Sequence, residues 1–262
     1  MAAGHTNHRT REFLDAMTSH RRQDPVMTTE SFPDYAPIPR SALGPAVNEH
    51  GYHVDRVERN LYWVTDGTYQ SAFLTTADGV VLFDAPPTIG NNIKRAVDEV
   101  ASANGVSNKV NYLIYSHHHA DHLGASSLFD EDVTRIGHEE TRRLLLRDND
   151  PARPANEETF QDRRTLDIGG DRIDLAWYGA NHSPDNIIIH LPDHDTLMMV
   201  DIVNPGWVPV YVSNLTEDIP GYLEAPANAL AHKWKPRRAL FLVVVLFPSE
   251  AGCEDTPTRE ML

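Results

Sequence analysis

The stretch SHHHADHLG, Ser116–Gly124, gathers four histidines and an aspartate within nine residues. It directly follows an apolar run, VNYLIYS (110–116), whose aromatic and β-branched residues predict a buried strand. His117 and His119 are two residues apart, so they point to the same side of an extended segment, and two imidazoles there can bind one divalent ion. His118 points the other way, and is expected either to support the ligands or to be exposed.

The next two polar residues of this stretch, Asp121 and His122, are consecutive. Their side chains diverge from the first pair and can hold a second ion nearby. Two-metal hydrolytic sites keep their ions roughly 3.5–4 Å apart, and a water or hydroxide can bridge them. The alternative is a histidine-rich loop without metal, but crowding or burying these groups with no ion would be costly. The stretch therefore predicts a metal centre.

The sequence on either side predicts alternating strands and helices. Apolar residues from Ile93 to Ala101 follow the i, i+3, i+4, i+7 pattern of one helix face, and this helix ends at Asn104-Gly105. A hairpin is expected around Gly169-Gly170. Further strands are predicted at 61–65, 71–76, 80–84, 134–137, 187–192, 196–202 and 239–247, and further helices at 139–146 and 222–234. This order predicts an α/β fold in which helices cover the sheets.

Composition limits the partners and the chemistry. The 262 residues include 23 Lys+Arg and 38 Asp+Glu, and the net charge of −15 disfavours nucleic acid or an anionic membrane as the main partner. The single Cys253 excludes an intrachain disulfide and a cysteine-based zinc cluster. No apolar run approaches the ~18 residues of a membrane span, and the first thirty residues hold no apolar signal core, so a cytoplasmic location is expected.

The pattern His117-x-His119-x-Asp121-His122 resembles the signature of the metallo-β-lactamase superfamily, and the similarity extends from about Tyr52 to Phe247. The resemblance implies an α/β fold, a four-layer αββα sandwich of two mixed β-sheets flanked by helices. That domain would occupy residues 51–247, between a polar N-terminal arm (1–50) and a polar C-terminal tail (248–262). In this family an aspartate matching Asp84 supports the metal-binding loop, although Asp84 alone could equally be a turn residue.

The resemblance also implies two ligands further along the chain. His182, in YGANHSPDN, matches the third histidine of the first metal site, and Asp201, at the end of LMMVD, matches the bridging aspartate. Their ordinary alternatives are a structural histidine and an aspartate that begins a loop. The family's last histidine, after the final core strand, has no counterpart, because His232 precedes that strand and no histidine follows it. The second ion, held by Asp121, His122 and Asp201, should therefore bind more weakly.

Three imidazole ligands that leave one coordination position open suit Zn²⁺. We expect one or two zinc ions per chain. Related iron enzymes of the superfamily carry an acidic residue at the place of His119, which favours zinc, although Mn or Fe in a mixed site stays open. Zinc-bound water has a pKa near 7, and Asp121 is the candidate catalytic residue that orients or deprotonates it. Loops 151–158 and 204–211, the latter with Trp207 and Tyr211, are expected to line a pocket for a small organic substrate.

The sequence thus predicts a metal-dependent hydrolase of a small organic ester, lactone, thioester or lactam. No GxSxG motif is present, which disfavours a serine nucleophile. The alternative is a metal-binding protein of the same fold with weak or no catalysis and a sensing or scaffold role. The missing last histidine favours that alternative.

Overall fold

The computed structural model describes residues 44–129, 132–203, 215–231, 234 and 236–242. The chain divides into two compact units, Met1–Pro37 and Ile38–Leu262, and every described residue belongs to the second unit. Most of the expected N-terminal arm and the whole expected C-terminal tail lie outside the described residues. Among the described residues, no helix combines the length and the apolar character needed to cross a bilayer.

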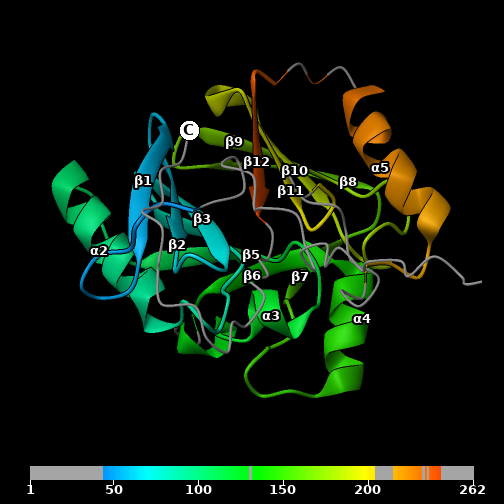
Figure 1. The fold of residues 1–262 in the computed structure, drawn as a ribbon, viewed down its shortest axis with the longest axis horizontal. Coiled ribbons are helices and arrows are strands. Elements are labelled where there is room, and N and C mark those ends of the chain that lie inside the picture. Colours follow the sequence, from blue (N-terminus) through cyan, green and yellow to red (C-terminus); the bar gives the residue numbers. More distant parts are fainter. Residues whose placement is uncertain (1–43, 130–131, 204–214, 232–233, 235, 243–262) are drawn as a thin grey trace, which may run out of the picture. The chain divides into compact units, whose positions relative to one another are not determined.

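The described residues form two mixed β-sheets (Figure 1). In the seven-stranded sheet the strands follow chain order, with antiparallel pairs from β1 to β4 and parallel pairs from β4 to β7. Its strands are β1 (His53–Glu58), β2 (Leu61–Thr65), β3 (Gln70–Thr76), β4 (Gly79–Phe83), β5 (Val110–Ile114), β6 (Thr134–His138) and β7 (Glu158–Phe160).

The five-stranded sheet has the order β12-β11-β10-β9-β8, and only β11 and β12 pair in parallel. Its strands are β8 (Arg163–Ile168), β9 (Asp171–Ala176), β10 (Ile188–Leu191), β11 (Thr196–Val200) and β12 (Arg238–Leu242). The described helices are α2 (Asn91–Asn104), α3 (Ala120–Leu123), α4 (Glu139–Asp148) and α5 (Ile219–Ala231), with short 3-10 turns at Ser126–Leu128 and Pro192–His194.

Three separate apolar cores define four layers. Alternate residues of a strand point to opposite faces of its sheet, so in β4 Leu82 packs with α2 while Val81 and Phe83 face the other sheet. The five-stranded sheet divides in the same way: Met198 belongs to the core between the sheets, and Leu197 packs toward α5. The predicted αββα sandwich is therefore confirmed, with helices on the outer face of each sheet (Figure 1).

Several predicted boundaries differ from the structure. The last described helix, α5, begins at Ile219 rather than 222, because the Asp218 carboxylate accepts a hydrogen bond from Gly221 N at 3.1 Å and caps the helix there. This helix ends at Ala231, and Trp234 lies beyond it. Strands β1 and β7 were not predicted, and residues 243–247 of the predicted final strand lie outside the described part.

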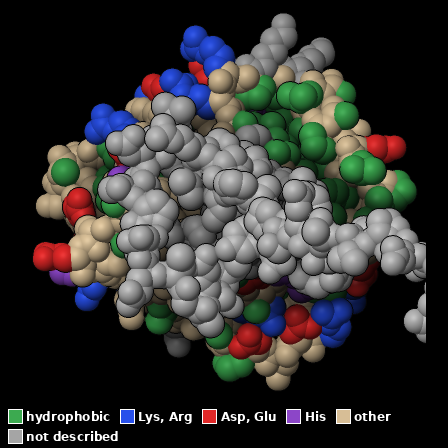
Figure 2. All heavy atoms as spheres, in the orientation of Figure 1, with side chains coloured by type: hydrophobic (Ala, Val, Ile, Leu, Met, Phe, Trp, Pro, Cys, Tyr) green, Lys and Arg blue, Asp and Glu red, His purple; other side chains and the backbone are tan. Residues whose placement is uncertain are grey.

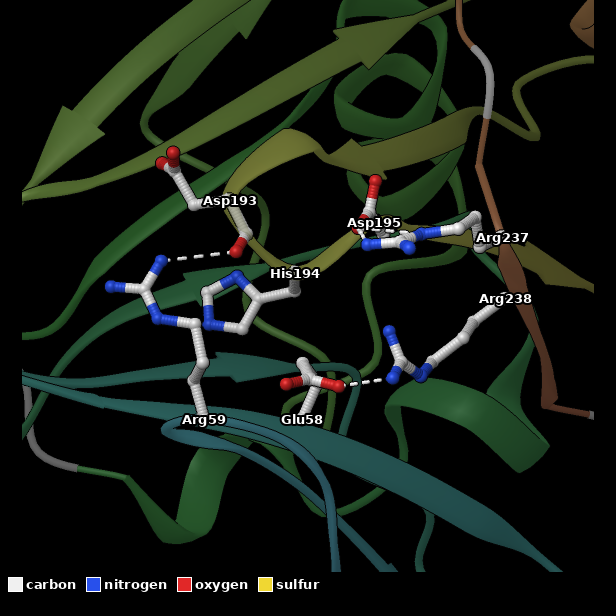
Figure 3. A pocket seen from close by; sticks show the side chains of 7 residues that line it. All are labelled: Glu58, Arg59, Asp193, His194, Asp195, Arg237 and Arg238. Carbon is white, nitrogen blue, oxygen red and sulfur yellow. Dashed lines mark hydrogen bonds and ion pairs between the residues drawn. The ribbon is translucent and has the colours of Figure 1, made fainter.

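A salt bridge and a hydrogen bond join the two sheets at the end where β11 begins (Figure 3). Glu58 of β1 pairs with Arg238 of β12, and Arg59 donates to the carbonyl of Asp193 at 3.0 Å. These groups surround a polar cavity of about 450 Å³. The metal-ligand candidate Asp201 follows the opposite end of β11, so this cavity is not part of the metal centre.

The outer face of α5 carries three large apolar side chains. Ile219, Leu223 and Leu230 are exposed there, and Figure 2 shows hydrophobic side chains gathered over the part of the surface where α5 lies. Elsewhere on this face acidic and basic side chains are interspersed.

Candidate metal centre

The candidate ligands lie where strands of both sheets end. Asp84 follows β4, and the stretch that begins at Ser116 follows β5 after one intervening residue. In the other sheet, Asp201 directly follows β11 and His182 lies in the loop between β9 and β10. Asp84 and Asp201 have φ angles of 59° and 57°, and a left-handed backbone at a non-glycine residue is typical of functional sites.

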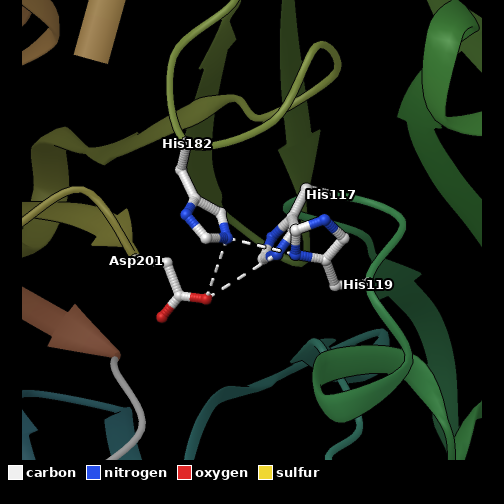
Figure 4. A group of neighbouring side chains, drawn as sticks. All are labelled: His117, His119, His182 and Asp201. Atoms are coloured by element: carbon white, nitrogen blue, oxygen red, sulfur yellow. Dashed lines mark hydrogen bonds and ion pairs between the residues drawn. The ribbon is translucent and has the colours of Figure 1, made fainter. Parts of the chain in front are cut away.

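The first group of donors consists of His117, His119, His182 and Asp201, whose ligand atoms lie within 4.8 Å of one another. Figure 4 shows the four side chains converging from the two sheets. Nε2 of His182 lies 3.1 Å from Nδ1 of His119 and 3.3 Å from Oδ2 of Asp201. Oδ2 of Asp201 also lies 3.8 Å from Nε2 of His117. Three imidazole nitrogens and a carboxylate oxygen thus face one small volume.

The second group consists of Asp121, His122 and Asp201. Nε2 of His122 lies 2.8 Å from Oδ2 of Asp201 and 3.6 Å from Oδ2 of Asp121. Asp201 belongs to both groups, as expected of a bridging ligand. The Asp121 side chain is 40% exposed, whereas those of His122 and Asp201 are 1% and 12% exposed, so Asp121 is the member of this group most open to solvent.

A chain of buried hydrogen bonds, called the relay below, runs from Asp84 through Ser116 to His117 and orients the His117 ring. The Asp84 carboxylate accepts hydrogen bonds from N and Oγ of Ser116, at 2.8 and 2.6 Å. Because the Ser116 hydroxyl donates to Asp84, it can accept from Nδ1 of His117, 2.9 Å away. Nε2 of His117 then carries the lone pair that a metal needs. Burial raises the pKa of Asp84 to about 6, against the opposing effects of His122 and Ser116.

His182 is oriented in a similar way. Its Nδ1 lies 2.8 Å from the carbonyl oxygen of Leu215, which can only accept, so Nδ1 carries the proton and Nε2 is left as a lone-pair donor. In His117, Nε2 is buried and has no hydrogen-bond partner among the described residues. A buried nitrogen without a partner is costly unless another ligand satisfies it. The donor set, imidazole and carboxylate, is one that zinc accepts.

The electrostatics of the centre also fit a cation. Burial, together with the other histidines of the cluster, holds the pKa of His117 well below its usual range, and burial and His182 lower the pKa of His119 to about 4. Both rings are therefore neutral at pH 7, as metal ligation requires. Burial would lower the pKa of His122, but the carboxylates of Asp201 and its neighbours outweigh it and raise that pKa to about 9. A second metal ion at His122 would have to displace this proton.

His118, between the candidate ligands His117 and His119, supports the ligand-bearing loop through contacts of its own. His118 is buried rather than exposed, and its Nδ1 lies 2.9 Å from Oδ1 of Asp185, which also accepts from Oγ of Ser183 at 2.7 Å. Arg153, in the loop 151–158 that was expected to line a pocket, donates to the backbone carbonyl of His118 at 2.6 Å. This loop therefore contacts the ligand-bearing stretch at the backbone of His118.

Sequence reasoning missed some residues around the centre. Ser116 is the first residue of the histidine-rich stretch, but the sequence does not distinguish it from other serines that follow a strand. Tyr69, between two predicted strands, carries no recognisable signal, but its hydroxyl donates to Asp121 over 3.5 Å. Burial and the nearby Asp121 raise the pKa of Tyr69 to about 12. The other residues considered from the sequence, Trp207, Tyr211 and His232, lie outside the described residues.

The sequence model of the metallo-β-lactamase superfamily matches residues 64–243, more than half of the chain. The chain therefore belongs to the metallo-β-lactamase superfamily. The match contains all six candidate ligands.

Two relatives are similar to this chain over part of their lengths. The chain is 27% identical over 154 residues to the 2,4-dinitroanisole O-demethylase subunit alpha of Nocardioides sp. (strain JS1661), covering 57% of this chain and 46% of the relative. It is 26% identical over 162 residues to the metallo-β-lactamase type 2 of Elizabethkingia meningoseptica, covering 58% of this chain and 63% of the relative. The matched region thus spans less than two thirds of either relative.

Solved structures show the same fold. The metallo-β-lactamase IND-7 superposes with a TM-score of 0.62 at 18% identity, covering 73% of this chain and 89% of that one. A metallo-β-lactamase from Pontibacter korlensis gives the same TM-score and identity, with 73% of this chain and 90% of the other covered. At this level of sequence identity the structural similarity establishes the fold. The reaction has to be inferred from the residues of the site.

Proposed function

We propose that the protein is a zinc-dependent hydrolase that acts on a small organic ester, lactone, thioester or lactam through a centre of up to two ions. The observation that carries the proposal is the pair of donor groups that share Asp201, one of them with a buried imidazole nitrogen that has no partner among the described residues. Zinc bound in such a site lowers the pKa of a coordinated water to near 7 and polarises a substrate oxygen. The tighter site is assigned to His117, His119 and His182.

The protein side chains have separate tasks in this proposal. Ser116 orients the ring of His117 and the carbonyl of Leu215 orients the ring of His182, so the geometry of these two ligands is set before the substrate arrives. Asp121 is the catalytic residue, because its half-exposed carboxylate can accept a proton from the attacking water and hold it near the substrate. Asp201 is a member of both donor groups and connects them.

The names of the relatives suggest which substrates to try first. One relative is named for O-demethylation of 2,4-dinitroanisole, and another is named a metallo-β-lactamase. Both names indicate cleavage at a small organic molecule, which agrees with a small-molecule substrate and with the acidic net charge of −15 that disfavours nucleic acid.

The test is a substrate panel assayed with zinc-loaded protein. It contains a carboxylic ester, a lactone, a thioester, a β-lactam and 2,4-dinitroanisole. We expect turnover of at least one class, and a loss of 100-fold or more in kcat in Asp121→Asn, within the range that a general base contributes. Asp98→Asn, an exposed change on α2, is the matched control and should retain full activity.

The second candidate function is metal binding without hydrolysis. The second donor group favours it, because among the described residues only Asp121, His122 and Asp201 offer ligand atoms to a second ion. Zinc-loaded protein that is inactive on every class of the panel, and equally inactive with added Mn²⁺, would select this alternative.

A further inference from the structure

Tyr69 belongs to neither donor group, but it contacts both Asp121 and His122, the two residues found only in the second group. The hydroxyl of Tyr69 donates to Oδ2 of Asp121 over 3.5 Å. Its ring meets that of His122 edge-on, with centroids 6.0 Å apart and an interplanar angle of 73°. Tyr69 thus links the exposed carboxylate of this group to its buried imidazole.

The backbone of Tyr69 is fixed by the turn that precedes it. Oγ1 of Thr65 donates to the Tyr69 carbonyl at 2.6 Å and accepts from Gly67 N at 2.9 Å. Oδ1 of Asp66 accepts from the backbone N of Thr68 and of Tyr69, at 2.8 and 2.7 Å. These bonds are the local side-chain bonds of a rigid turn. The tyrosine is therefore held in place by the connection between β2 and β3, independently of the ligand-bearing stretch.

We propose that Tyr69 is a positioning residue for the second metal ion. A tyrosine hydroxyl can donate a hydrogen bond, and a carboxylate oxygen accepts one. The hydroxyl restrains Oδ2 of the Asp121 carboxylate, whose side chain is 40% exposed, while the ring lies edge-on to that of His122. This inference rests on the proposed function, since it assumes that Asp121 and His122 hold an ion.

The test is calorimetric titration of zinc into metal-free protein, which needs no substrate. Tyr69→Phe keeps the ring and removes the hydroxyl. We expect the step assigned to His117, His119 and His182 to be unchanged and the second step to weaken by about tenfold, the lower end of the range for groups that orient metal ligands. Tyr52→Phe is the matched control: that hydroxyl donates to the Glu99 carboxylate at 2.9 Å, and its loss should change neither step.

A second variant tests the role of the turn. Asp66→Ala removes two backbone hydrogen bonds that fix Tyr69 and leaves its hydroxyl in the sequence, so it should weaken the second step in the same direction. The absorption spectrum of Co²⁺ loaded at two equivalents should change in both variants, while that at one equivalent should not.

The outcomes separate this inference from the proposed function. Equal weakening of both steps in Tyr69→Phe, or no change in either, would overturn the positioning role and leave the metal centre intact. Wild-type protein that binds a single zinc would overturn the role of Tyr69 as well, while the first site would stand. Wild-type protein that binds no zinc would contradict the proposed function itself.

Discussion

Oδ2 of Asp201 lies 2.8 Å from Nε2 of His122, and the same oxygen lies 3.3 Å from Nε2 of His182. One carboxylate oxygen from the five-stranded sheet therefore reaches a histidine of each donor group. The left-handed backbone of Asp201 places this side chain at the end of β11, where the two sheets meet the ligand-bearing stretch. Binding at the two groups should consequently be coupled through Asp201.

The first prediction concerns this coupling. Asp201→Asn removes the shared negative charge and should weaken both zinc-binding steps, lowering kcat on any substrate found by 100-fold or more, because both ions lose a ligand. Calorimetry and steady-state kinetics measure the two effects. Asp195→Asn, at the other end of β11, loses only an exposed pair with Arg237 and should resemble the wild type. A variant at Asp201 with two unchanged binding steps would show that this residue is no bridge.

The second prediction concerns the tighter site. His119→Ala removes one of three imidazoles, so the dialysed protein should lose most of the zinc bound by the first group. Metal analysis of protein dialysed against a weak chelator measures the loss, and far-UV circular dichroism checks that the fold is kept. Full zinc content in this variant would remove His119 from the ligand set.

The third prediction concerns pH and metal-free protein. His122 has a pKa of about 9 in the folded state, above the ordinary value of 6.5, because the carboxylates that surround it outweigh its burial. The folded state thus binds this proton more tightly than the unfolded state, and the resulting stabilisation is complete below pH 6.5 and lost as the pH rises through 9. We expect the free energy of unfolding in urea to fall by on the order of 1–3 kcal/mol over this interval.

The control for this pH dependence is His122→Gln. It lacks the titrating group, so its free energy of unfolding should change much less between pH 6.5 and 9.5. An identical decline in the variant and the wild type would assign the effect to another residue. Zinc-saturated wild type should also decline less, since metal binding displaces the proton from His122.

The fourth prediction concerns the relay behind His117. Asp84→Ala leaves the buried N–H of Ser116 without its partner and places alanine at a φ of 59°, so it should destabilise the protein by about 2–4 kcal/mol in thermal or urea unfolding. Asp84→Asn keeps an acceptor, and asparagine tolerates a left-handed backbone. It should cost less than half as much. Equal costs for both variants would contradict the relay.

The residue pattern predicted the order of strands and helices, and the four-layer arrangement followed from the family resemblance. In β3 and β4 successive apolar residues divide between two cores, as is typical of strands buried on both faces. Helix ends were harder, because α5 begins at a cap formed by Asp218, whose effect depends on local backbone geometry. Strand β7 has only three residues and forms by pairing with β6, a contact distant in sequence.

Residue type and spacing predicted His117, His119, Asp121 and His122 as ligands, and the family resemblance added His182 and Asp201. The structure brings His117, His119, Asp121 and His122 together with His182 and Asp201, which lie more than 55 residues further along the chain. Residues that act by position alone could not be found this way. Tyr69 approaches Asp121 because β2 and β3 place their connecting turn there, and Arg153 reaches His118 from a surface loop.

The most direct test of the metal centre is anomalous X-ray diffraction at the zinc absorption edge from crystals of the zinc-loaded protein. We expect one strong peak among His117, His119 and His182, and a second peak beside Asp121 and His122 that grows with the zinc concentration of the soak, with Asp201 between them. No anomalous peak at these residues at saturating zinc, or a peak only at other side chains, would contradict the account.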